Sequence, residues 1–117
     1  MMPIARPSLP ELSDYVARLE DIWESHMLSN FGKHAQEFEH KAQTYLGNPY
    51  VRAVSSCDVG LIIALRALEL PPGFQCIVPS FTFNSTVNAI LWNRLRPVFC
   101  DIDGDSLNAD HSDIESR

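Results

Sequence analysis

The second half of the sequence alternates short apolar runs with longer segments in which apolar residues recur every three or four positions. The short runs 50–54 (YVRAV), 75–79 (QCIVP) and 97–102 (PVFCDI) each predict a β-strand. The segments 58–70 and 83–93 predict helices. Two successive β-α-β units require crossover connections, so they predict an α/β fold with parallel strands and helices packed against the sheet. The strands lack polar–apolar alternation, which is typical of strands covered on both faces.

The first part of the chain predicts two helices. Apolar residues at helical spacing indicate a helix from about residue 10 to residue 25, with Ser8 as its cap and Pro10 in its first turn. A second helix is expected over 33–46, and Gly47 is expected to end it.

At 117 residues the chain has the length of one modest domain, with a helical segment at 1–47 and an incomplete α/β domain at 48–117. Its 9 Lys and Arg residues against 15 Asp and Glu residues give a net charge of −6, which argues against nucleic-acid binding. The sequence has no apolar run of membrane-spanning length and no signal-peptide pattern, so we expect a cytoplasmic protein. Cys57, Cys76 and Cys100 lack CxxC spacing and are expected to be buried free thiols.

In parallel α/β sheets, ligands bind at the carboxyl ends of the strands. The first such end is the turn SSCD (55–58). Its backbone N–H groups at Cys57, Asp58 and Val59 can bind an anion, helped by the positive end of the helix dipole. The same residue types also suit a plain helix cap with no ligand, so both interpretations stay open.

The second strand end, SFTFN (80–84), carries two aromatic residues. Phe81 or Phe83 can lie flat on a planar heterocycle, and the alternative is that both are core residues between helix and sheet. The sequence has no GxGxxG or GxxxxGK[ST] motif and therefore lacks the phosphate-binding glycines of dinucleotide and P-loop sites. The acidic stretch DIDGD (101–105) fails the EF-hand pattern and is expected to be a solvated loop.

Three stretches cover nearly the whole chain: LPELSDYVARLEDIW with LSNFGKHAQEFE, then VSSCDVGLIIALRALELPPG, then VPSFTFNSTVNAILWNRLRPVFCDIDGDSLN. In this order they resemble the sugar aminotransferases of the DegT/DnrJ/EryC1/StrS family, which are fold-type-I enzymes dependent on pyridoxal 5'-phosphate (PLP). The resemblance implies part of a fold-type-I large domain. It also implies amination of a keto sugar linked to a nucleotide, with an amino acid such as glutamate as donor and a homodimer as the assembly.

The resemblance implies that Ser56, Cys57 and Asp58 receive the cofactor phosphate and that Phe83 stacks on the pyridine ring. Asp58 departs from the threonine usual in the family. An ionised carboxylate within about 4 Å of a phosphate costs on the order of several kcal/mol at a partly buried site. We expect Asp58 to cap its own helix instead. The alternatives are a neutral carboxyl that donates a hydrogen bond, or a chain that no longer holds the cofactor well.

The resemblance further implies that Asn30, Phe31 and Gly32 border the sugar-nucleotide site. The lysine with which the family binds the cofactor covalently has no counterpart here, because the only lysines, Lys33 and Lys41, lie in the early helix. We therefore expect the first part of a longer enzyme, or the product of a disrupted gene, that is inactive alone. The alternatives are a non-catalytic remnant or small interaction domain, and a nucleotide-binding module of flavodoxin-like topology.

Overall fold

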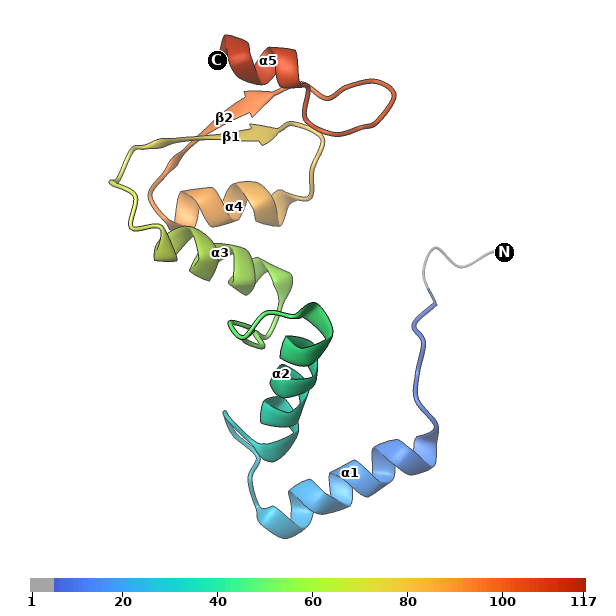
Figure 1. Ribbon diagram of the computed structural model, residues 1–117. Helices are drawn as coiled ribbons and strands as arrows, with labels where there is room; N and C mark the ends of the chain where they lie inside the picture. The colour runs from blue at the N-terminus through green and yellow to red at the C-terminus, as the bar shows by residue number, and fades with distance from the viewer. Residues whose placement is uncertain (1–5) are drawn as a thin grey trace. The chain divides into compact units, whose positions relative to one another are not determined.

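The computed structural model describes residues 6–117 (Figure 1). The chain divides into two compact units, Met1–Ala53 and Val54–Arg117. This boundary lies six residues beyond the one expected from the sequence, because the segment after the second helix binds to that helix. Among the described residues, none of the helices is both long and apolar enough to cross a membrane.

The first unit contains the two expected helices, α1 (Leu12–Ser25) and α2 (Lys33–Leu46). Gly47 ends α2 as predicted, with a left-handed φ of 62° and its N–H donated to Thr44. The predicted cap at Ser8 is wrong. Helix α1 begins only after Glu11, which has no side-chain capping bond, so Ser8 and Pro10 both precede the helix.

The second unit contains α3 (Cys57–Ala67), β1 (Gln75–Pro79), α4 (Asn84–Trp92), β2 (Arg96–Cys100) and α5 (His111–Ser116). The two strands pair in parallel. The register runs from Gln75 opposite Arg96 to Pro79 opposite Cys100. This mixed α/β architecture with parallel strands confirms the predicted fold class.

A small apolar core joins α4 to the sheet. Val78 of β1, Ile90 of α4 and Leu95 before β2 are almost fully buried. The Asn93 side chain ties α4 to α3 by donating to the carbonyl of Ile62 at 3.1 Å. Both helices are therefore fixed relative to the two strands.

The predicted strand at 50–54 has no strand partner among the described residues, so this prediction is wrong for the structure at hand. Its backbone groups bond to side chains of α2 instead. The Ala53 N–H donates to Glu39 at 2.9 Å, and Gln43 donates to the Val51 carbonyl at 3.5 Å. A strand needs a neighbouring backbone for its ladder, and β1 and β2 pair with each other.

The other predicted boundaries agree to within a few residues, with the largest difference at the end of α3. This helix stops at Ala67 rather than residue 70, and Glu69 adopts a left-handed φ of 51°. Pro71 and Pro72 follow, and the residue before a proline is driven away from helical geometry. The chain after Asp110 forms a further helix, α5.

We predict that Ile90→Ala lowers the free energy of unfolding of the second unit by about 2–4 kcal/mol, because it opens a cavity between α4 and the sheet. The matched control is Leu91→Ala, one position along, where the side chain is 54% exposed. The control is expected to cost less than about 1 kcal/mol. Urea unfolding followed by circular dichroism measures both, and equal losses would contradict the assigned core.

Candidate functional site

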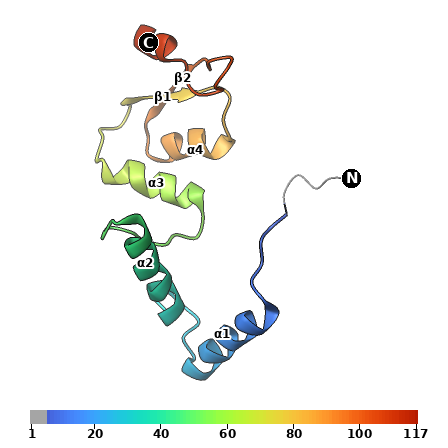
Figure 2. The same ribbon diagram turned by 45° about the vertical axis from the view of Figure 1, so that its right-hand side comes forward.

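The residues predicted to bind a cofactor lie at one end of the second unit. In both views the arrowheads of β1 and β2 and the first turns of α3 and α4 lie at the same end (Figures 1 and 2). Ser56 stands immediately before α3, Cys57 and Asp58 are its first two residues, and Phe83 stands immediately before α4. The fold therefore brings the two predicted halves of the cofactor site to one edge.

Ser56 caps α3, which corrects the expectation that Asp58 does so. The Ser56 hydroxyl accepts a hydrogen bond from the Val59 N–H at 3.3 Å. Asp58 is the second residue of the helix and lies in its first turn. The physical reason is position: a capping residue stands immediately before the first helical residue, as Ser56 does, whereas Asp58 lies within the helix.

The first turn of α3 retains donors suitable for an anion. The N–H groups of Cys57 and Asp58 find no acceptor among residues 6–117, whereas Gly60 already donates to the Ser56 carbonyl. Two free amides at the positive end of a helix fit a phosphate group. The carboxylate of Asp58 is the one unfavourable group, and it is exposed to solvent rather than buried beside the amides.

Phe83 and Phe81 are not core residues, because their side chains are 73% and 67% exposed. This excludes the alternative in which both pack between helix and sheet. Phe83 has an extended backbone and precedes α4 without capping it. An exposed aromatic ring at the strand end is available to stack on a planar heterocycle.

The loop with Asn30, Phe31 and Gly32 belongs to the first unit. Phe31 has a left-handed φ of 60°, its side chain is 75% exposed, and its carbonyl accepts a 2.6 Å hydrogen bond from Gln36. Beside it is an open hollow of about 340 Å³. Its lining residues are Asn30, Phe31, Ala35, Gln36, Glu39 and Ala53. Sequence reasoning missed Gln36, since nothing in the sequence signals that a glutamine five residues on will bind this carbonyl.

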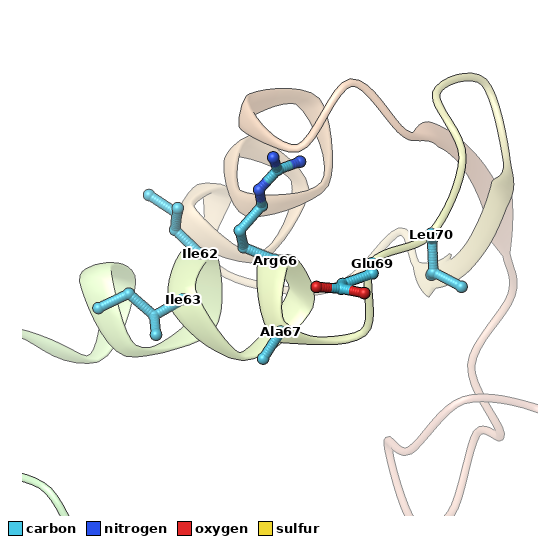
Figure 3. Close-up of a pocket in the computed structure, with 6 residues that line it drawn as sticks. All are labelled: Ile62, Ile63, Arg66, Ala67, Glu69 and Leu70. Carbon is cyan, nitrogen blue, oxygen red and sulfur yellow. The ribbon is translucent and has the colours of Figure 1, made fainter.

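A larger hollow of about 600 Å³ lies along the second half of α3 and the turn after it (Figure 3). Its lining residues are Ile62, Ile63, Arg66, Ala67, Glu69 and Leu70. Arg66 extends to the opposite side of the helix from Ala67, so polar groups do not converge on one point (Figure 3). The hollow is far along the helix from the free amides and is not part of the candidate site.

The three cysteines are free, as predicted, but they are not all buried. Cys100 is buried, Cys76 is half-buried and Cys57 is exposed. Cys57 differs because it begins a helix instead of lying in a strand. It contributes a backbone N–H to the candidate anion site.

A parallel α/β unit with an anion-binding helix start and an exposed aromatic at its strand ends is typical of a phosphate-bearing cofactor site. Residues 11–117 match the DegT/DnrJ/EryC1/StrS aminotransferase family, and the chain belongs to this family. This confirms the resemblance read from the sequence.

Individual relatives agree with the family. The chain is 40% identical over 114 residues to a dTDP-4-amino-4,6-dideoxy-D-glucose transaminase of Escherichia coli, covering 97% of this chain and 30% of that protein. It is 32% identical over 114 residues to the UDP-4-amino-4-deoxy-L-arabinose–oxoglutarate aminotransferase of Shewanella sediminis, covering 97% of this chain and 29% of that protein.

A solved structure has a similar fold. The crystal structure of NtdA from Bacillus subtilis with bound cofactor PMP superposes with a TM-score of 0.84 at 30% identity, over 99% of this chain and 28% of that one. This neighbour confirms the expected fold-type-I class. The chain spans about 30% of the length of these relatives.

We predict that Ser56→Ala destabilises the second unit by about 0.5–2 kcal/mol, because the Val59 N–H loses its acceptor. Ser55→Ala is the matched control, and a change within about 0.5 kcal/mol is expected there. Thermal unfolding of both variants measures the difference. If Ser55→Ala proves the more costly of the two, Ser56 is not the cap.

Proposed function

We propose that this chain forms the phosphate-binding and ring-stacking side of the PLP site in an aminotransferase. The observation that carries the proposal is the pair of free amides at Cys57 and Asp58, at the same end of the unit as the exposed ring of Phe83. When bound, PLP supplies an electron sink for removing a proton from the amino-bearing carbon. The amides hold the phosphate end, and Phe83 orients the ring.

The proposed reaction is transfer of an amino group to a keto sugar linked to a nucleotide. The names of the E. coli and S. sediminis relatives, both aminotransferases of nucleotide-linked sugars, support this substrate class. Oxoglutarate in the second name supports glutamate as the amino donor, because glutamate becomes 2-oxoglutarate when it loses its amino group. We assign contact with the sugar nucleotide to Asn30, Phe31 and Gly32.

The proposed assembly is a homodimer. Large apolar side chains of α1 and α2 are exposed, including Trp23 at 75% and Phe38 at 61%. Such side chains are the kind that a second subunit covers in a stable assembly.

The proposal leaves the proton-transfer step to residues outside these 117. Both lysines of the sequence lie in α2, and both are ion-paired: Lys33 with Asp21 at 2.9 Å and Lys41 with Glu37 at 2.7 Å. Neither follows a strand. A lysine held as a charged partner of a carboxylate is a poor nucleophile toward an aldehyde.

We predict that pyridoxamine 5'-phosphate shifts the amide signals of Cys57 and Asp58 and the ring signals of Phe83 in a saturable NMR titration. Pyridoxamine, which lacks the phosphate, is the matched ligand control and is expected to give much weaker shifts at the amides. Shifts that are equal for the two ligands, or that fall elsewhere in the chain, would contradict the assigned phosphate site.

The variant Asp58→Thr tests how strongly the carboxylate opposes the phosphate. Because the side chain is exposed, we expect affinity for pyridoxamine 5'-phosphate to rise less than about tenfold, the equivalent of ~1.4 kcal/mol. A hundredfold gain would mean that the carboxylate lies against the bound phosphate.

We predict that the chain alone does not attach PLP at a specific lysine. Incubation with one equivalent of PLP and borohydride reduction should leave label spread weakly over Lys33, Lys41 and the N-terminus. Peptide mass spectrometry measures this distribution. Stoichiometric label on one lysine would show that the chain has its own reactive amine. It would contradict the proposal that residues outside these 117 carry out the proton transfer.

A further inference from the structure

The loop between α1 and α2, residues 26–32, connects two helices in which no residue is buried (Figure 1). No apolar core within the described part of the first unit therefore fixes the ends of this loop. The two helices meet through charged side chains instead. The conformation of the loop depends on polar contacts that can be named individually.

Asp21 connects the two ends of the loop. Its carboxylate accepts from the Lys33 ammonium at 3.1 and 2.9 Å, one bond to each oxygen. The Nε2 atom of His34 lies 3.1 Å from the same carboxylate. The hydrogen bond from Lys33 holds the pKa of Asp21 below its usual range. The Asp21 side chain of α1 thus binds Lys33 and lies beside His34, both in the first turn of α2, with the whole loop between them.

Further charges surround this contact. Arg18 lies 3.4 Å from both the His34 Nδ1 atom and the Glu37 carboxylate. Glu37 also accepts from Lys41 at 2.7 Å. An open hollow between the two helices is lined by Arg18, Glu37 and Asp14, and Asp14 forms no ion pair among the described residues. The contact is a network of two carboxylates, Asp21 on α1 and Glu37 on α2, with His34 within 4 Å of both.

Gln36 fixes the backbone inside the loop. A left-handed φ of 60° is unfavourable for a bulky residue such as Phe31 and persists only where surrounding contacts hold it. The Gln36 side chain donates to the Phe31 carbonyl at 2.6 Å, while its own N–H donates to the Gly32 carbonyl at 3.1 Å. Both bonds come from the first turns of α2, which Asp21 anchors.

We propose that Asp21 and Gln36 are positioning residues that hold the 26–32 loop in one conformation and keep the Phe31 ring directed to solvent. Asp21 joins the ends of the loop, and Gln36 locks its strained residue. The consequence for substrate rests on the proposed function, in which Asn30 and Phe31 contact the sugar nucleotide. The loop is then ordered before the substrate arrives.

Limited proteolysis of the full chain tests the proposal. Chymotrypsin cleaves after exposed Phe31, and cleavage after Phe74, which is 55% exposed in the second unit, serves as the internal reference. We expect Asp21→Asn and Gln36→Ala each to accelerate cleavage at Phe31 roughly three- to tenfold relative to Phe74. The expected rise follows from a larger population of open loop.

Two variants are matched controls. Asp14→Asn removes a neighbouring carboxylate of α1 that has no ion pair among the described residues. Gln43→Ala removes a glutamine of α2 that bonds to Val51 instead of the loop. Both should cleave at the wild-type rate after Phe31. The proposal is overturned if the controls accelerate cleavage after Phe31 as much as Asp21→Asn or Gln36→Ala does.

Salt dependence separates positioning through charge from a general loss of structure. Exposed ion pairs are screened by salt, so wild-type cleavage at Phe31 should rise between about 0.02 and 1 M NaCl. In Asp21→Asn, cleavage at Phe31 should be fast and should not change with salt over this range. In Asp21→Glu, cleavage should regain part of its dependence on salt. If the wild-type ratio of Phe31 to Phe74 cleavage is flat with salt, the role of Asp21 is refuted, even where a variant fails to fold.

Adding a ligand to the proteolysis experiment tests the positioning residues separately from the proposed substrate contact. dTDP-glucose at millimolar concentration is the probe, and protection of Phe31 in the wild type supports substrate contact at the loop. If Asp21→Asn is cleaved faster but dTDP-glucose does not protect the wild type, the positioning role of Asp21 is supported and the substrate contact is refuted. Unchanged cleavage in both Asp21→Asn and Gln36→Ala refutes the positioning residues whatever the probe does.

Discussion

The packing of α4 against β1 and β2 determines where every candidate cofactor contact of this chain lies. Ile90 buries itself against Val78 and Leu95, and Asn93 then links α4 to α3 through the Ile62 carbonyl. α4 packs on the two strands and α3 packs on α4, and the first turns of both helices lie at the carboxyl end of the sheet. Two loops distant in sequence thereby place a pair of amides and an aromatic ring at the same end of the sheet, as the proposed cofactor site requires.

The two units are stabilised by different interactions. The second has a small apolar core, whereas the helices of the first have no buried residue. They meet through the ion pairs of Asp21 with Lys33 and of Arg18 with Glu37. Exposed ion pairs contribute little individually and weaken with salt. The first unit is therefore the part whose conformation responds most readily to solution conditions or to a covering surface. The loop assigned to substrate contact lies in this unit.

Sequence periodicity predicted the elements that need only local information. The strand at 75–79 and the helix at 33–46 were located to the residue. The strand predicted at 50–54 does not form, because a strand depends on a neighbouring strand that periodicity cannot reveal. In this structure α2 side chains bind the backbone of the segment instead. The same limit applies to the site. Residue type indicated an anion-binding turn, but only the position of the first helical residue showed that Ser56, and not Asp58, is the cap.

Two features make Asp58 compatible with the proposed phosphate site: its side chain is exposed, and Ser56 rather than Asp58 caps the helix. With Ser56 acting as cap, the carboxylate lies in the first turn, where an acid stabilises a helix by about 0.3–1 kcal/mol. The amides of Cys57 and Asp58 remain available. Two negative charges about 4 Å apart cost ~1 kcal/mol in water, against several in a partly buried site. At the proposed phosphate site we therefore expect an exposed Asp58 to weaken binding without preventing it. We expect this cost to rise where other polypeptide covers this end of the sheet and excludes water.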